Sequence, residues 1–124
     1  MQHKSYLFRM NRTFYFYETA AGNRPVEKFM NSQTEEVREE LLTVMRYIEE
    51  HRVVPSALFK KLKSTKDIWE VRVRVGGNIF RILCFFDGTK LIVAASGFQK
   101  KTQKTPTQEI RTAEKRKKEY FKNK

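Results

Sequence analysis

The sequence predicts one α+β domain in which two N-terminal helices and a basic C-terminal helix pack on a small, mostly antiparallel sheet. Three observations indicate this class: an apolar stripe with helical spacing in the first half, three β-prone runs in the second half, and turn residues between them. The 124 residues are enough for a single modest core. We expect residues 1–124 to form one domain, with residues 1–11 as an N-terminal extension and either Met1 or Met10 as the start.

The first predicted elements are a strand and a short helix. Residues 13–18 (TFYFYE) are aromatic and β-prone, and they predict a strand that ends at the turn formed by Gly22 and Asn23. Pro25 suits the first turn of a helix, because its φ is already helical and its missing N–H would have no partner there. We expect this helix to run through Met30.

A second helix is predicted by a continuous apolar stripe. Its members are spaced i, i+4, i+7 and i+11, on one helical face: Val37, Leu41, Val44 and Ile48. Ser32 and Glu35 have the S-x-x-E spacing of a capping box and predict the first turn, and Pro55 ends the helix. The segment 33–52 is acidic. It either balances the basic half of the chain or contributes to a contact with a partner protein.

Three runs in the second half predict consecutive strands. Residues 68–75 alternate between apolar and charged, as in a strand with one buried face. Residues 79–86 are nearly all apolar, which is typical of a central strand covered on both faces. Residues 91–96 make the third run, and the Asp-Gly pair at 87–88 predicts a tight hairpin before it. We expect the aromatic residues of these runs and Cys84 to lie in the core.

The last helix is predicted over residues 105–122. Thr105 as N-cap, Pro106 at the first helical position and Gln108 as the capping-box partner form its start signal. The helix is strongly basic, and its apolar positions are sparse: Ile110, Ala113, Tyr120 and Phe121. It is therefore expected to dock weakly or to depend on a partner.

The charge distribution indicates a polyanionic partner. Lys and Arg number 26 against 14 Asp and Glu, so the formal net charge is +12. The segment 25–52 is net negative (−3), while residues 99–124 alone carry +7. A chain of this charge is suited to nucleic acid, because lysine and arginine release counterions from the phosphates they bind.

Several classes of protein are excluded by what the sequence lacks. Its single cysteine, Cys84, rules out an internal disulfide. Two histidines, His3 and His51, and one cysteine offer no zinc-ligand spacing, so we expect no metal and no cofactor. No apolar run approaches the ~20 residues of a transmembrane helix, and the basic N-terminus lacks the apolar region of a signal peptide. The expected location is the cytoplasm, with no membrane partner.

Three strings in the chain resemble one family. Residues 17–29 contain Tyr-Glu, Gly and then Arg-Pro-Val-Glu-Lys-Phe, residues 69–82 contain Trp-Glu-Val-Arg and then Phe-Arg-Ile, and residues 97–106 read GFQKKTQKTP. Glu109, Ile110 and Ala113 continue the match. These strings and the order of elements resemble the phage-derived HigB-like (Gp49-like) toxins of the RelE/HigB superfamily, over roughly residues 13–121.

The resemblance implies a RelE-like fold and the toxin of a type II toxin–antitoxin system. It implies a ribosome-dependent endoribonuclease that cuts mRNA without a metal ion and so blocks translation. The implied partners are a cognate helix-turn-helix antitoxin, the ribosome with its rRNA, and mRNA. Two other functions stay open: a ParE-like toxin that inhibits DNA gyrase by binding, and a nucleic-acid-binding module without catalytic activity.

One position departs from the family pattern. Members of this group often carry His or Asn before the Gly-Phe pair, where this chain has Ser96. His3 lies in the extension and His51 at the end of a predicted helix. We therefore expect no histidine-based proton transfer.

Cleaving RNA through its own 2′-hydroxyl requires a base, an acid and cations that stabilise the phosphate. The planar fork of arginine can hold two phosphate oxygens, and the candidates are Arg72, Arg74 and Arg81. Arg72 and Arg74 share one face of their strand, where they either bind phosphate or are ordinary surface charges. Arg81 is the stronger candidate, because a single charge in an apolar strand needs a partner or a ligand.

The base is expected from Glu70, Lys100 or Lys101. A lysine among arginines is partly neutral, because like charges disfavour its protonated form, and both lysines follow the last predicted strand. Glu70 is kept ionised by neighbouring cations, and it either acts as the base or orients Arg72 or Arg74.

Further residues are candidates for RNA binding through charge, hydroxyl or stacking: Lys60, Lys61, Lys63, Phe98, Thr102, Lys104 and Arg111. The lysines at 60–63, Arg111 and the basic run 115–118 are expected to face ribosomal RNA. Phe98 either stacks on a base or packs at the edge of the core. Thr102 either binds a phosphate or caps a turn.

Overall fold

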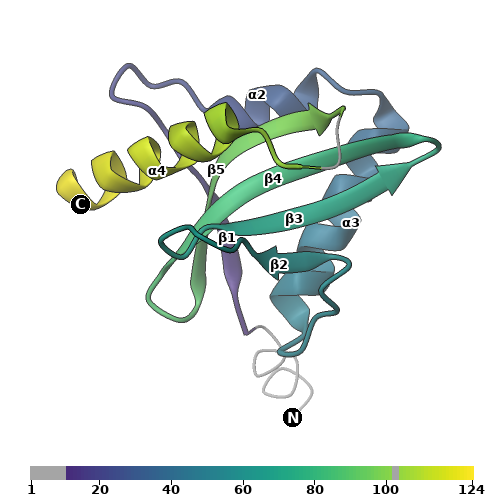
Figure 1. The fold of residues 1–124 in the computed structure, drawn as a ribbon, viewed down its shortest axis with the longest axis horizontal. Coiled ribbons are helices and arrows are strands. Elements are labelled where there is room, and N and C mark those ends of the chain that lie inside the picture. Colours follow the sequence, from purple (N-terminus) through teal and green to yellow (C-terminus); the bar gives the residue numbers. More distant parts are fainter. Residues whose placement is uncertain (1–10, 102–103) are drawn as a thin grey trace, which may run out of the picture.

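The computed structural model describes residues 11–101 and 104–124, which form a five-stranded sheet with helices on both faces (Figure 1). The elements follow one another in this order: β1 (Thr13–Phe16), α2 (Pro25–Asn31), α3 (Glu35–Glu50), β2 (Phe59–Lys61), β3 (Trp69–Val75), β4 (Asn78–Asp87), β5 (Leu91–Lys100) and α4 (Thr107–Lys122). The strand order is β1-β5-β4-β3-β2, and β1 runs parallel to β5 whereas the other neighbours are antiparallel. The predicted α+β class is confirmed, and the architecture is consistent with a RelE-like fold.

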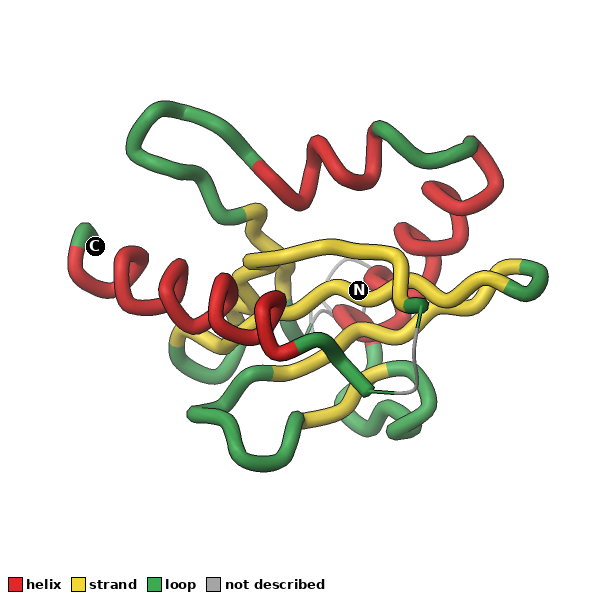
Figure 2. The backbone as a smooth tube through the Cα atoms, turned by 45° about the horizontal axis from the view of Figure 1, so that its top comes forward, coloured by secondary structure: helices red, strands yellow, loops and turns green. Residues whose placement is uncertain are grey.

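The sheet separates two layers of helix (Figure 2). α2 and α3 cover one face, and α4 lies against the other, next to β4 and β5. Successive side chains of a strand point to opposite faces, so β4 supplies Ile82 and Cys84 to the α3 side but Leu83 and Phe85 to the α4 side. All four are fully buried, as expected for a central strand covered on both faces.

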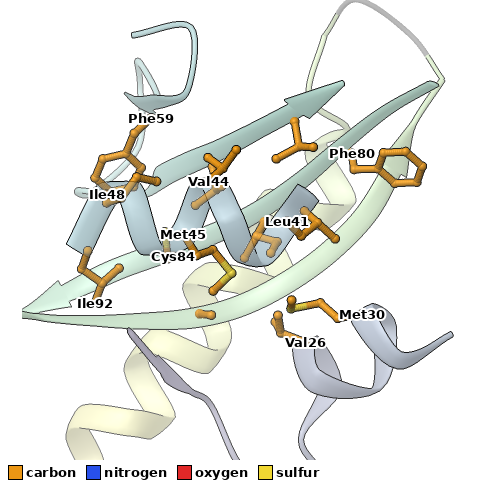
Figure 3. Close-up of a cluster of buried hydrophobic side chains, with 14 of the residues drawn as sticks. Val26, Met30, Leu41, Val44, Met45, Ile48, Phe59, Phe80, Cys84 and Ile92 are labelled. Carbon is orange, nitrogen blue, oxygen red and sulfur yellow. The ribbon is translucent and has the colours of Figure 1, made fainter. Parts of the chain in front are cut away.

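The larger part of the core lies between α3 and the sheet (Figure 3). All members of the apolar stripe predicted for this helix are buried: Val37, Leu41, Val44 and Ile48. Met45 is buried beside them. Val26 and Met30 of α2 complete the cluster. Each such side chain contributes about 1.5–3 kcal/mol by its removal from water.

The start of α3 differs from the prediction. Thr34 is the N-cap, and its hydroxyl accepts a hydrogen bond of 3.2 Å from the backbone N–H of Val37. Ser32 instead ends α2, where its hydroxyl donates to the carbonyl of Phe29 at 2.7 Å. The predicted capping box of Ser32 and Glu35 is therefore wrong. The connection between the two helices is so short that Ser32 belongs to the end of α2, and Thr34 takes the N-cap position of α3.

Two strand boundaries also differ. β5 continues to Lys100 rather than ending at Ser96, because its pairing with β4 resumes after an irregularity at Leu83 and Cys84 and runs on to Ile79. Lys100 is thus the last residue of the strand rather than a residue after it. β2 is an additional edge strand that pairs with the first half of β3.

The start of α4 is a further correction. The helix begins at Thr107 with Pro106 as N-cap, and no side chain caps it. The capping box of Thr105 and Gln108 is therefore wrong, because the Thr105 hydroxyl donates instead to Glu70, 35 positions earlier in the chain.

α4 docks through few apolar side chains and several polar ones. Ala113 is buried, with Ile110 and Tyr120 beside it in a second apolar cluster on this face. Burial, together with a hydrogen bond to Asp87, raises the pKa of Tyr120 to about 12. Hydrogen bonds between α4 and the sheet with its flanks include Ser96 to Glu109 (2.8 Å), Arg116 to the carbonyl of Ala95 (2.7 Å), Tyr17 to Glu119 (2.9 Å) and Tyr120 to Asp87 (2.6 Å).

The packing of α2 on β5 depends on a glycine. A Cβ at Gly97 would lie 2.5 Å from Cδ2 of Phe29, so Gly97→Ala forces the Phe29 ring to shift. We expect this variant to lower the free energy of unfolding by about 1–3 kcal/mol, measured by chemical denaturation. Gly77→Ala is the matched control, since a Cβ there meets nothing within 4 Å. Equal losses in the two variants would contradict the close approach.

Candidate functional site

Charged side chains from three neighbouring strands gather on the sheet face that carries α4. Arg72 lies opposite Arg81, and Ile79 lies between Arg74 on one side and Lys100 on the other. Directly opposed residues of antiparallel strands point to the same face. We refer to Arg72, Arg74, Arg81 and Lys100 as the cation cluster.

A buried carboxylate stands beside the cation cluster. The Glu70 side chain is only 2% exposed, and its Oε1 lies 3.3 Å from Nε of Arg81 and 3.4 Å from Nε of Arg72. Its Oε2 accepts a hydrogen bond of 2.6 Å from the Thr105 hydroxyl. Burial of an unpaired charge costs several kcal/mol, and these contacts offset that cost. Of the two roles left open for Glu70, the orienting one fits a carboxylate whose two oxygens are both engaged and shielded from solvent.

The arginines of the cluster differ in exposure. Arg81 is 8% exposed, and its Nη1 donates to the carbonyl of Phe80 at 3.3 Å. Arg72 is half-buried, and its Nη1 donates to the carbonyl of Ser56 at 3.4 Å. Arg74 is exposed. The expectation that Arg81 needs a partner in its apolar strand is met by Glu70.

Lys100 is also buried at the sheet face, at 8% exposure. This burial lowers the pKa of its ammonium group, and the positive charges of Arg81, Arg72 and Lys60 lower it further, against the opposing effect of Glu70. Lys60 belongs to this electrostatic environment because it lies opposite Glu70 in the register of β2 and β3. A lysine in these surroundings is closer to its neutral form than a surface lysine.

A groove of about 450 Å³ opens beside β3, on the edge where the short β2 pairs only with the first three residues of that strand. Three members of the cation cluster line it, together with residues of α3, of the segment before β2 and of β3 itself: Arg72, Arg74, Arg81, Glu40, Val44, Ala57, Leu58 and Val73. Guanidinium groups in such a groove are suited to a phosphodiester, which they can hold by charge and by paired N–H donors.

The structure therefore brings together five of the six residues that the sequence named for catalysis. Glu70, Arg72, Arg74, Arg81 and Lys100 share the face, and Lys101 follows directly and is exposed.

The residues named for RNA binding are more scattered. Lys60 lies opposite Glu70, on the same face as the cation cluster. Lys61 lies opposite Trp69, on the other face of the sheet, and pairs with Asp67 at 2.9 Å. Lys63 and Lys104 are exposed in loops, and Thr102 lies outside the described residues.

Phe98 lies under α4 rather than at the surface. It is 8% exposed and belongs to the apolar cluster that includes Leu83 and Ala113. Core packing, one of the two roles the sequence left open for it, accounts for this position.

Arg111 lies elsewhere, on the outer side of α4. A groove of about 800 Å³ runs along this helix and is lined by Lys66, Arg111, Glu114, Lys115, Lys117, Lys118, Phe121 and Lys122. Arg111 thus contributes, with Lys115, Lys117 and Lys118, to a basic surface distinct from the cation cluster.

Two residues at the site were assigned other roles from the sequence. Thr105 was expected to cap a helix, yet it contacts Glu70. Ser96, where the resemblance led us to expect His or Asn, is 3% exposed, and its hydroxyl donates to Glu109. No local pattern signals either contact, because each partner comes from a different element of the fold.

Other chemistries have no support in the described residues. Cys84 is buried, which raises the pKa of its thiol, so it is not an activated nucleophile. His51 ends α3 and stacks on Tyr47 with ring centroids 3.9 Å apart. Across residues 11–101 and 104–124, no three His, Cys, Asp or Glu side chains group as a metal site would require, and no helix there has the length and apolarity needed to cross a bilayer.

Comparison with known proteins supplies the family. The family model described as "Phage derived protein Gp49-like (DUF891)" matches residues 28–118, which span α3, the four antiparallel strands and most of α4. A comparison with curated proteins gives no match. The matched region contains Glu70 and the whole cation cluster. The chain belongs to the phage-derived Gp49-like family, a group of HigB-like toxins.

Proposed function

We propose that this protein is the toxin of a type II toxin–antitoxin pair and that it cleaves mRNA on the ribosome. The observation that supports this most directly is the cation cluster beside the groove, in which Glu70 pairs with Arg72 and Arg81. The chain's membership of a HigB-like toxin family agrees with it. A cognate helix-turn-helix antitoxin is the expected inhibitor, and the cytoplasm the expected location.

In the proposed reaction the 2′-oxygen of the RNA attacks the adjacent phosphorus and the bond to the 5′-oxygen breaks. Negative charge accumulates on the phosphate oxygens as this happens. Arg72 and Arg81 have their Nε atoms turned to Glu70, so their positions are set before a substrate arrives. Groups fixed in this way stabilise a transition state without reorganising, which is the main source of electrostatic catalysis.

Lys100 is our assignment for the base that accepts the 2′ proton. Its lowered pKa favours the neutral amine that such a base requires. Glu70 is the weaker candidate, because its carboxylate is buried and both of its oxygens are engaged. Lys101 is exposed next to Lys100 and is kept as an alternative.

Dependence on the ribosome follows from what the site lacks. The described residues place no histidine in the cation cluster, so proton transfer rests on groups less suited to neutral pH. The ribosome would raise the rate instead by holding the mRNA with its 2′-oxygen aligned for attack on the phosphorus. The basic groove along α4 and Lys60 on the edge strand offer positive surface for the rRNA backbone.

The experiment that tests this function is primer extension on a defined mRNA in a purified translation system. We expect new 5′ ends that appear only when ribosomes are loaded. Arg81→Lys keeps the charge but loses the fork, and we expect it to lower cleavage by about 100-fold. This variant is preferred to alanine, which would leave Glu70 buried with one ion pair fewer.

The matched control is Arg46→Lys, at an exposed position on α3. Equal unfolding midpoints in the two variants would separate loss of activity from loss of folding. Intact mRNA with the unmodified protein would contradict the proposal. Inhibition of gyrase supercoiling would then indicate a ParE-like toxin, and RNA binding without either effect would indicate a non-catalytic module.

The assignment of Lys100 predicts a pH dependence. If its neutral form is the base, the rate on ribosome-bound mRNA rises with pH and levels off above the lowered pKa of Lys100. Lys100→Arg stays protonated throughout, so we expect it to lose this rise and about 100-fold or more of the rate. Single-turnover cleavage from about pH 6 to about pH 9 measures both. Lys90→Arg, in the β4–β5 turn, is the exposed control, and an unchanged profile in Lys100→Arg would exclude Lys100 as the base.

A further inference from the structure

The Glu70 carboxylate has two differently occupied oxygens. Oε1 takes both ion pairs, to Arg72 and Arg81, and Oε2 takes the hydrogen bond from Thr105. The terminal torsion of a glutamate is broad and roughly two-fold, so the side chain itself does not fix the plane of the carboxylate. A donor held at Oε2 does fix it, and thereby sets where Oε1 meets the two guanidinium groups.

Thr105 is available for this contact because it does not cap α4. A threonine at the N-cap position stabilises a helix, because its hydroxyl oxygen accepts a hydrogen bond from a backbone N–H of the first turn. Here Pro106 is the N-cap, without a side-chain bond, and the Thr105 hydroxyl points to Glu70. The contact with Glu70 thus engages the Thr105 hydroxyl that an N-cap hydrogen bond would otherwise have used.

Thr105 is itself held in place by the helix that follows it. α4 begins two residues later, and its first turn is tied to β5 by the hydrogen bond of 2.8 Å between Ser96 and Glu109. Thr105 is thus fixed relative to the sheet from one side and bonded to Glu70 on the other. The position of α4 is in this way connected to the carboxylate that anchors the arginines.

We propose that Thr105 is a positioning residue of the RNA-cleaving site, which acts through Glu70 to orient Arg72 and Arg81 toward the scissile phosphate. This inference rests on the proposed function for its catalytic consequence. The orientation of the arginines by Thr105 is a structural statement that is testable without cleavage.

The test compares three variants of the full chain on ribosome-bound mRNA. Thr105→Val removes the hydroxyl at nearly constant volume, and Thr105→Ser keeps it. Thr107→Val is the control, at an exposed position two residues along. We expect Thr105→Val to lower kcat by about 10- to 100-fold with a smaller change in KM, as small misplacements of catalytic groups do. Thr105→Ser is expected to restore kcat to within about 3-fold, and Thr107→Val to leave it unchanged.

A second readout does not require cleavage. The Nε–H signals of Arg72 and Arg81 are followed by NMR, with and without an RNA oligonucleotide blocked by 2′-O-methylation. We expect both signals to shift in Thr105→Val and to return in Thr105→Ser, with weaker binding of the oligonucleotide in the valine variant alone. If the unmodified protein proves not to cleave mRNA, these signals still test the positioning of the arginines.

Two results would overturn the inference. One is a Thr105→Val protein with a lower unfolding midpoint but an unchanged kcat and unchanged arginine signals, since that describes a merely structural threonine. The other is a Thr105→Ser protein as impaired as the valine variant. If Thr105→Val does not fold, Thr105→Ala removes the same hydroxyl without placing a methyl group against Oε2, and the same comparisons apply.

Discussion

The arrangement of the candidate site depends on the burial of one carboxylate. Glu70 lies on the sheet face beside two arginines and a threonine, at 2% exposure, and its charge would be strongly unfavourable there without them. The dependence is mutual, because Arg81 is a charge in the central strand and has Glu70 as its ion-pair partner. Removal of Glu70 takes away the ion-pair partner of Arg81, and removal of Arg81 leaves Glu70 with one ion pair fewer, so the pair constrains β3 and β4 together.

The two faces of the sheet serve different purposes. The face under α2 and α3 carries the larger apolar cluster, which supplies most of the buried apolar area of the fold. The opposite face is apolar only where α4 crosses it, around Leu83, Phe85 and Val93. Beyond the start of α4 the same strands carry Arg72, Arg81 and Lys100. A single alternation along each strand thus builds a core on one side and a charged surface on the other.

α4 belongs to both the core and the site. Its apolar contribution is small, with Ala113 buried and Ile110 and Tyr120 beside it, so polar contacts account for much of its attachment. The residues before it reach back to the sheet, where Thr105 meets Glu70. A change in the position of α4 would therefore shift Thr105 and, through Glu70, the two arginines, without a rearrangement of the sheet.

The sequence by itself determined the elements whose signals are periodic. The stripe of Val37, Leu41, Val44 and Ile48 predicted the buried face of α3. The alternation from Trp69 to Val75 predicted that Glu70, Arg72 and Arg74 share a face, but not that Glu70 is buried there. Such patterns depend only on the geometry of the helix and the strand, so they can be recognised before any tertiary contact is known. The family resemblance was likewise present in the strings at residues 69–82 and 97–106, which the family match covers, whereas the match leaves out most of the string at residues 17–29.

Only the tertiary structure decided how polar groups with more than one possible partner are used. Ser32 and Thr105 both stood in helix-capping patterns, yet one ends the preceding helix and the other bonds to a residue 35 positions away. The length of β5, and with it the place of Lys100 on the strand, followed from pairing with β4. A hydroxyl bonds to whichever of its possible partners the fold brings within reach, and a strand extends as far as its neighbour pairs with it. Both outcomes depend on contacts between elements far apart in the sequence, so no local sequence pattern predicts them.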